Sequence, residues 1–248
     1  MLNFLIAPDF PPENFSGWHI FNTLLQKRTG LRIRLLTPAD SQEENQMYQQ
    51  NRVDLVYANP FHAAELIRRE AYLPVVRPID CPDEMVIATY ADAPFQHSDE
   101  LPEQSRILVT DNADVRLVGL RLLESAALSE YDIRWEKAAT FQAAARRLIA
   151  REAEAAFFLS SAYRAFNTST RERLRVLMES RLDDISHVLV VHPDSAAHRR
   201  PLCDAFTQMR RDRAGEMVLA DLGISQGFEQ LDEEDAEFMI DLMDTLRD

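Results

Sequence analysis

The stretch NRVDLVYANPFHAAEL, residues 51–66, contains the transition that the rest of the chain repeats. VDLVYA is a largely apolar run of the kind that forms a strand buried on both faces. Asn59 and Pro60 come next, and they suit the cap and the first position of a helix, where the missing N–H of proline costs nothing. The stretch therefore predicts a strand followed at once by a helix, the repeating unit of an α/β sheet.

The same alternation extends in both directions from this stretch. Upstream, NFLIAP and LRIRLL predict strands, and between them lies an expected helix that Gly30 ends. Downstream, expected strands cover 72–79, 84–91, 106–111, 132–139, 155–159, 175–180 and 186–193. Between and after them, expected helices cover 60–70, 115–126, 140–152 with Thr140 as cap, 160–174, two segments within 195–222, and the acidic segment 232–248. The apolar face of the first helix is formed by Phe15, Trp18, Phe21, Leu24 and Leu25.

Composition and charge restrict the class of partner. The chain has 248 residues, of which 46% are hydrophobic, so it can bury a substantial core. Its 27 basic and 41 acidic side chains give a formal net charge of -14, which repels nucleic acid and anionic membrane surfaces. We expect no nucleic-acid partner and no insertion into a membrane.

The N-terminal sequence and the cysteines bear on location. The first residues show no basic region followed by a long apolar segment and a small-residue cleavage site. Cys81 and Cys203 show no disulfide spacing, and reduced thiols are the simpler interpretation. We therefore expect a cytoplasmic protein, or a periplasmic one if a signal peptide has been removed.

Motifs for catalysis or metal binding are absent from the sequence. The six histidines form no H-E-x-x-H pair, and no serine-hydrolase or nucleotide-binding signature occurs. Cys81 with His187 would be a conceivable thiol and imidazole pair, whereas a small buried cysteine and an unrelated histidine explain both residues as well. We expect no enzyme activity, no cofactor and no metal.

The segment VTDNADVRLVG, residues 109–119, predicts a strand end, a turn and the start of a helix. Such a turn often binds an anion, because free main-chain N–H groups and the helix dipole point towards it. Here the turn contains Asp111 and Asp114. If Asp114 caps the helix, it removes donors that an oxyanion would need and adds repulsion between like charges. A purely structural role for Asp114 as a helix cap explains the same residue.

Three segments together resemble a known family. IAPDFPPENFSGWHIFNTLLQKRTG (6–30), NRVDLVYANPFHAAEL (51–66) and LADLGISQGF (219–228) are similar to the phosphate, phosphite and phosphonate-binding proteins of ABC importers, a branch of the type II periplasmic-binding-protein fold. This resemblance implies an α/β protein with two lobes, two hinge crossings and an interlobe cleft. Lobe 1 would hold residues 1–82 and 187–248, lobe 2 residues 83–186, and the crossings would lie near residues 80–86 and 181–188.

The resemblance also implies where a ligand would bind, at loops that follow the strands. The expected ligand-binding residues are Asp9, Phe10, Tyr57, Asn59, Phe61, Asp111, Asn112, Asp114, Ser160 and Ser161. Local structure accounts for some of them equally well, with Asn59 as a helix cap and Phe61 as a packing residue. The chain departs from the family where phosphonate-binding members typically carry a hydroxyl-rich turn, which here is DNAD.

These observations predict a non-catalytic protein that binds or senses a small ligand other than free phosphate or a simple phosphonate. A transporter or a signalling protein would then be the partner that reads ligand binding. Two alternatives stay open at the level of sequence. One is a cytoplasmic enzyme on the same fold, and the other is a degenerate relative that acts as a protein-interaction module.

Overall fold

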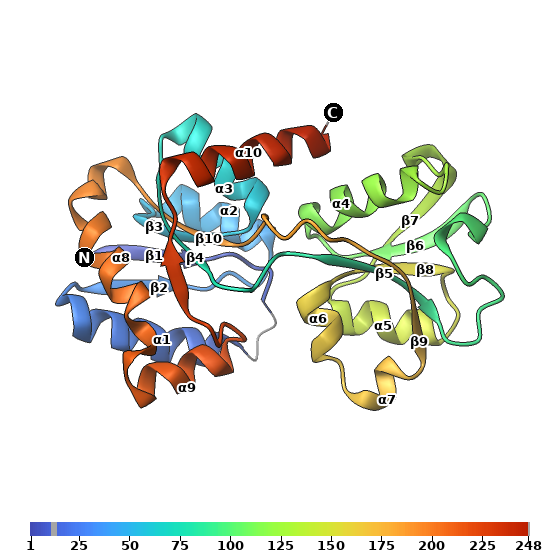
Figure 1. The fold of residues 1–248 in the computed structure, drawn as a ribbon, viewed down its shortest axis with the longest axis horizontal. Coiled ribbons are helices and arrows are strands. Elements are labelled where there is room, and N and C mark those ends of the chain that lie inside the picture. Colours follow the sequence, from blue (N-terminus) through green and yellow to red (C-terminus); the bar gives the residue numbers. More distant parts are fainter. Residues whose placement is uncertain (11–13, 248) are drawn as a thin grey trace. The chain divides into compact units, whose positions relative to one another are not determined.

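The computed structural model describes residues 1–10 and 14–247, which divide into two compact units (Figure 1). Unit 1 comprises Met1–Pro82 and Asp184–Thr245; unit 2 comprises Asp83–Asp183 and the last residues from Leu246. The chain returns to unit 1 at Asp184, earlier than the expected residue 187, and Ile185, Ser186 and His187 are already buried. We describe each unit by itself.

Unit 1 is built on a six-stranded mixed sheet in the order β11-β4-β10-β3-β1-β2. Neighbours β2, β1 and β3 are parallel, whereas β10 runs antiparallel to both β3 and β4, and β11 antiparallel to β4. The strands are β1 (Leu2–Ile6), β2 (Ile33–Leu36), β3 (Leu55–Ala58), β4 (Leu73–Pro78), β10 (Val188–Val191) and β11 (Phe228–Gln230). β11 was not predicted from the sequence, which is consistent with its length of three residues.

Helices cover both faces of this sheet (Figure 1). They are α1 (Phe15–Thr29), α2 (Ser41–Gln50), α3 (Pro60–Glu70), α8 (Arg199–Thr207), α9 (Arg213–Asp221) and α10 (Glu233–Arg247), with 3-10 turns at Pro193–His198 and Met209–Arg211. Local signals set their ends as predicted. Gly30 ends α1 with a left-handed φ of 70°, and Asn59 caps α3 with Pro60 in its first turn.

The core of unit 1 is rich in aromatic side chains. Trp18, Phe21 and Leu25 of α1 are fully buried, as the predicted apolar face requires, and Phe15 and Leu24 are half-buried. Phe21 packs against Phe206 of α8 and Phe228 of β11. Burying side chains of this size contributes roughly 2 to 3 kcal/mol each, so this cluster fixes α1 and α8 on the sheet.

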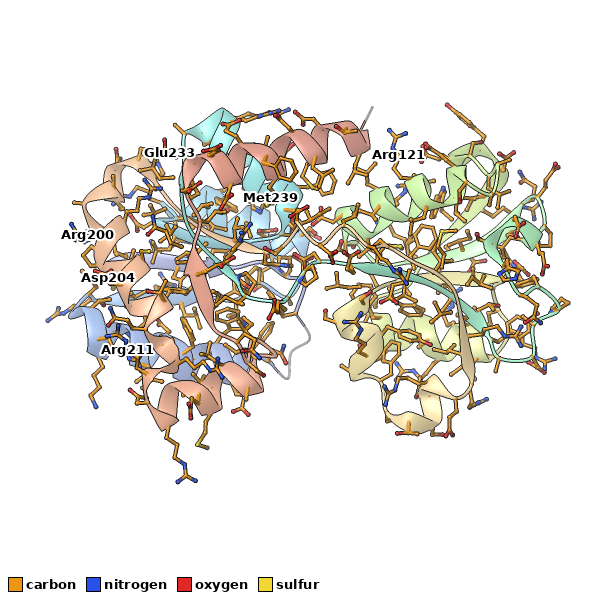
Figure 2. The ribbon with its side chains drawn as sticks, viewed as in Figure 1. Arg121, Arg200, Asp204, Arg211, Glu233 and Met239 are labelled. Carbon is orange, nitrogen blue, oxygen red and sulfur yellow. The ribbon has the colours of Figure 1, made fainter. Side chains whose placement is uncertain are left out.

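The acidic helix α10 is held to unit 1 by apolar packing and by arginines. Met239, labelled in Figure 2, is only 2% exposed, whereas Glu233 at the start of α10 pairs with Arg199 at 3.3 Å. Arg68 of α3 pairs with Asp241 at 2.9 Å. The negative charge of this helix is therefore partly balanced by basic residues of the same unit.

Unit 2 is built on a five-stranded sheet in the order β7-β6-β8-β5-β9. β6 is parallel to β7 and β8, and β5 is antiparallel to β8 and β9. The strands are β5 (Met85–Tyr90), β6 (Ser105–Val109), β7 (Ile133–Lys137), β8 (Ala155–Leu159) and β9 (Leu174–Glu179), and the helices are α4 (Ala113–Glu124), α5 (Phe141–Ile149), α6 (Ser160–Ala165) and α7 (Thr168–Arg171), with 3-10 turns at Ser98–Glu100 and Glu130–Asp132.

Close packing of α4 against β8 defines the core of unit 2. Every residue of β8 is buried, and the ring of Phe157 lies directly beneath Gly119 of α4. A Cβ atom at position 119 would lie 2.3 Å from that ring, so the ring would have to shift to admit any larger residue. Thr140 caps α5 as predicted, its hydroxyl accepting from the N–H of Ala143.

The predicted fold class is confirmed, because the chain forms two separate mixed sheets with helices. The two sheets also share a plan. Each has three neighbouring parallel strands followed by one antiparallel strand, β10 in unit 1 and β5 in unit 2. Both of these strands come directly after a segment that joins the units, residues 180–187 and 79–84 respectively. We call these residues the connecting segments.

Candidate functional site

In unit 1 the predicted site residues gather at the edge where β1 and β3 end, here called its carboxyl edge. Asp9 and Phe10 follow β1, and Asn59 follows β3. His187 precedes β10, and because β10 is antiparallel to β3, with Val188 opposite Ala58, its first residue lies at the same edge. The sheet therefore brings together residues that are far apart in sequence.

Asp9 is the centre of this group. Its Oδ2 accepts a hydrogen bond from the amide of Asn59 at 3.1 Å and lies 3.3 Å from Nε2 of His187. The side chains of Asp9 and His187 are 6% and 5% exposed. Burial opposes ionisation, but the hydrogen bond and charge of His187, with the bond from Asn59, outweigh it and hold the pKa of Asp9 below its ordinary value. Asp9 is thus a buried carboxylate with fixed partners.

Aromatic rings surround the Asp9 and His187 pair. Phe10 stacks on Tyr57 with ring centroids 5.8 Å apart, and the imidazole of His187 lies 5.0 Å from Phe10 and 5.4 Å from Tyr57. Trp18 packs against Tyr57 from the core, with ring centroids 5.0 Å apart. Tyr57, near the end of the buried strand β3, therefore supports both His187 and Phe10.

Asn59 has two roles, which resolves the alternative interpretations of this residue. Its Oδ1 accepts from the N–H of His62 and caps α3, while its Nδ2 donates to Asp9. Helix capping thus fixes the amide that holds the carboxylate. Phe61 is buried at 7% exposure in the first turn of α3, so packing explains much of its position.

A second polar group extends from α3 to α2. Nδ1 of His62 lies 3.3 Å from a carboxylate oxygen of Glu44, and its Nε2 lies 3.4 Å from the hydroxyl of Tyr48. Burial raises the pKa of Tyr48, so its hydroxyl stays protonated. These contacts fix the imidazole of His62 beside the capping residue Asn59.

In unit 2 the predicted turn lies at the corresponding carboxyl edge, after β6, but its cap differs from the prediction. Asn112 caps α4, its Oδ1 accepting from the N–H of Val115 at 2.8 Å. Asp114 is the second residue of the helix, and it is 8% exposed. The prediction that Asp114 caps the helix is therefore wrong. The local sequence DNAD offers several capping side chains, and the backbone places Asn112 at the extended position that a cap requires.

The negative charge of Asp111 in this turn is balanced by a lysine. Its carboxylate forms an ion pair with Lys137, which ends the neighbouring strand β7, at 2.6 Å. Both side chains are exposed, at 61% and 79%, so water screens the pair. Asp114 is buried in the first turn of α4, where the helix dipole favours a carboxylate.

The two predicted serines lie at the start of α6. Ser160 is buried at 1% exposure, and its hydroxyl donates to Glu179 at 3.3 Å, while Arg164 donates to the same carboxylate at 2.8 Å. Ser161 is exposed. Ser160 is therefore part of a built polar group, and Ser161 presents its hydroxyl to solvent.

Known proteins share this sequence pattern and this architecture. A family described as ABC transporter, phosphonate, periplasmic substrate-binding protein matches residues 4–236. The chain belongs to this phosphonate-binding family. The predicted resemblance and the predicted role of a solute-binding protein are thereby confirmed. A search of curated proteins finds no match.

Solved structures share the fold of this family member at low sequence identity. PhnD1 of Prochlorococcus marinus, in complex with methylphosphonate, is 12% identical with a TM-score of 0.82, covering 99% of this chain and 98% of that one. A binding protein of an ABC phosphonate transporter from Pseudomonas aeruginosa is 16% identical with a TM-score of 0.82, covering 98% and 85%. The aliphatic sulphonate binding protein SsuA of Escherichia coli is 14% identical with a TM-score of 0.67, covering 99% and 87%.

Membership also bears on location. The family is described as periplasmic, so the expectation of a cytoplasmic protein is not supported. Among the helices that the structure describes, none is long and apolar enough to cross a bilayer.

Several residues at these edges have roles that depend on tertiary structure and could not be found from local sequence alone. His187 was placed near a crossing but not at the site, and Glu84, Lys137 and Glu179 were not singled out. The signal that would have found His187 is its position just before the strand VLVV. An antiparallel strand starts where its parallel neighbours end, so this residue reaches the carboxyl edge.

Proposed function

We propose that this family member binds a small solute whose recognised group at the α4 turn is neutral or cationic rather than a phosphonate. Phosphonate and phosphate are bound by several N–H donors, and a nearby carboxylate repels their negative charge. In this chain Asn112 already uses the N–H of Val115, and the buried carboxylate of Asp114 occupies the same turn. The burial of Asp114 is the observation that carries the proposal, since water screens a buried charge poorly.

The carboxyl edge of unit 1 supports the same ligand class. It presents an ionised carboxylate, Asp9, among the rings of Phe10, Tyr57 and His187. Aromatic faces and carboxylates both favour positively charged or neutral polar groups over anions. The ten residues predicted from the sequence, together with His187, are the ligand-contacting set that we propose.

We propose that the protein delivers its bound solute to a transporter, in keeping with the family. We also propose, as a second point, that the chain has no catalytic activity of its own. Incubation with a metabolite mixture followed by mass spectrometry tests the second point. Product that forms in proportion to protein concentration would contradict it.

Titration calorimetry tests the ligand class. The unmodified chain should show no tight binding of inorganic phosphate or methylphosphonate, whereas a thermal-shift screen of amines, quaternary ammonium compounds and neutral polyols should yield a stabilising ligand. A ligand at about 100 times its Kd stabilises the folded state by roughly 2.7 kcal/mol, which such a screen detects.

A substitution separates the effect of Asp114 from general charge effects. Because Asn112 is the cap, Asp114→Ser keeps the helix start and removes one buried charge. The affinity for methylphosphonate should rise at least about tenfold, equivalent to ~1.4 kcal/mol. Asp204→Ser, at an exposed position of α8 labelled in Figure 2, changes the net charge equally and should have no effect. Tight methylphosphonate binding by the unmodified chain would overturn the proposal.

A further inference from the structure

Glu84 is a buried carboxylate that the ligand-contacting set does not include. It is the last residue of the first connecting segment, 6% exposed, and lies directly before β5. In the described part of the chain no arginine or lysine forms an ion pair with it. A carboxylate buried without a cationic partner requires several hydrogen-bond donors, and the identity of those donors indicates its role.

Among the described residues, the donors to this carboxylate come from the second connecting segment. The hydroxyl of Ser180 and the N–H of Leu182 donate to it, and the N–H of Asp183 donates to its Oε1 at 2.9 Å. The hydroxyl oxygen of Ser180 also accepts from the N–H of Met85 at 2.9 Å. Glu84 thus fastens the start of β5 to the second connecting segment.

The main chain of Glu84 makes a further link, to the candidate ligand site. Its carbonyl oxygen accepts from the N–H of Ser160, the first residue of α6, at 2.7 Å. One residue therefore contacts α6 through its main chain and the second connecting segment through its side chain. A shift of Ser160 has a path of two hydrogen bonds to Asp183.

The backbone at the end of this path is strained. Asp183 has a φ of 37°, and Asp80 in the first connecting segment has a φ of 51°. Residues other than glycine rarely adopt this left-handed region, and they keep it only where the surroundings hold them. The bond from the N–H of Asp183 to Glu84 is such a restraint.

We propose that Glu84 is a positioning residue that couples Ser160 at the ligand site to the freedom of residues 182–184 to bend. The coupling rests on the proposed function, in which Ser160 contacts the solute. The restraint itself is a property of the unliganded chain. The two are therefore separable by experiment.

Hydrogen exchange on the full chain without ligand tests the restraint. In Glu84→Ala the exchange protection of the Leu182 and Asp183 amides should fall at least about tenfold, because hydrogen bonds to a charged acceptor are lost. Glu84→Gln keeps the shape and one acceptor oxygen and should show a smaller loss, which covers the case in which the alanine variant does not fold.

A matched control exists at the opposite edge of the same sheet. Glu154 precedes β8, accepts from the N–H of Arg106 at 2.7 Å and pairs with its guanidinium. Glu154→Gln should lower protection near Arg106 and leave Leu182 and Asp183 unchanged. Equal loss of protection at 182 and 183 in the Glu154 variant would reduce the role of Glu84 to general stability and overturn the proposal.

The path from Ser160 is tested by Ser160→Pro. Proline is tolerated at the first position of a helix, and Leu159 already has the extended backbone that precedes proline, so the variant removes the N–H that donates to Glu84 together with the hydroxyl. Protection at Asp183 should fall in Ser160→Pro and not in Ser160→Ala, which loses the hydroxyl alone. Unchanged protection in Ser160→Pro would overturn the coupling. Failure to find any solute would instead contradict the proposed function and leave these measurements valid.

Discussion

Units 1 and 2 use the same arrangement of strands at their carboxyl edges and place different chemistry on it. In unit 1 His187 precedes the antiparallel strand β10, and Asn59 follows its parallel neighbour β3. In unit 2 Glu84 precedes the antiparallel strand β5, and Ser160 follows its neighbour β8. In unit 1 these positions form a buried network around Asp9. In unit 2 the side chain of Glu84 is directed to the connecting segment, and the turn after β6 carries an exposed ion pair. The two edges share a strand arrangement, so the difference in strength between the buried Asp9 contacts and the exposed Asp111 ion pair comes from burial and not from topology.

The largest expected effect tests whether the two units are separate in stability as well as in structure. A Cβ at Gly215 of unit 1 would lie 1.7 Å from the main-chain oxygen of Met209, and one at Gly119 of unit 2 would lie 2.3 Å from Phe157. Gly215→Ala should destabilise unit 1 by about 3 kcal/mol, because main chain has little room to relax, and Gly119→Ala should destabilise unit 2 by about 2 kcal/mol, because the ring of Phe157 must shift.

Hydrogen exchange resolved by residue measures this separation. Gly119→Ala should lower the protection of β8 and leave β1 and β3 protected, and Gly215→Ala should do the reverse. Loss of protection in both sheets for either variant would show that the units unfold as one.

The next effect concerns the buried network around Asp9 in unit 1. Asp9→Asn keeps the shape but removes the charge that Asn59 and His187 contact. It should cost about 2 kcal/mol in the free energy of unfolding, because hydrogen bonds to a buried charged group are worth more than neutral ones. Urea denaturation checks this value, and a loss within ±0.5 kcal/mol would mean that the carboxylate is not a structural centre.

The dependence on pH follows from the same carboxylate. The pKa of Asp9 is lower in the folded chain than in the unfolded chain, so its contribution is fully present above about pH 4 and is lost as pH falls through the folded value. The difference in unfolding free energy between the unmodified chain and Asp9→Asn should shrink by about 1 kcal/mol or more on acidification. Urea titrations from neutral to acidic pH measure it, and a constant difference contradicts the assignment.

The smallest effect is expected at the exposed pair of unit 2. Asp111→Asn removes the contact to Lys137, whose two side chains are both largely exposed. The change in unfolding free energy should stay below about 0.5 kcal/mol, since solvent screens such pairs. Lys137→Gln is the matched variant. A loss as large as that of Asp9→Asn would remove the contrast between the units.

The sequence predicted those features that depend on neighbouring residues. Asn59, Pro60, Gly30 and Thr140 end or begin helices through local backbone preferences, so they could be assigned without a fold. The choice of Asn112 over Asp114 as cap could not be made in this way, because both side chains have suitable oxygens and only the backbone geometry distinguishes them.

Contacts between residues far apart in the chain could not be predicted from local sequence signals. The contact of His187 with Asp9 joins residues 178 positions apart, and that of Glu84 with Asp183 joins residues 99 positions apart. Hydrophobic patterning showed where β10 and β5 lie along the chain, but their antiparallel place within each sheet decides what the preceding residue touches. That information comes from topology, which the resemblance supplied only in outline.

The position of β10 in its sheet has a consequence for biosynthesis. β10 lies between β3 and β4, yet it is translated after all five strands of unit 2. While the chain grows, β3 and β4 have no strand between them until residue 191 is available. Unit 2, by contrast, takes all five of its strands from the uninterrupted segment Asp83–Asp183. β3 and β4 must therefore wait for β10 before they are joined in one sheet, and the sheet of unit 2 is the first that the nascent chain can complete.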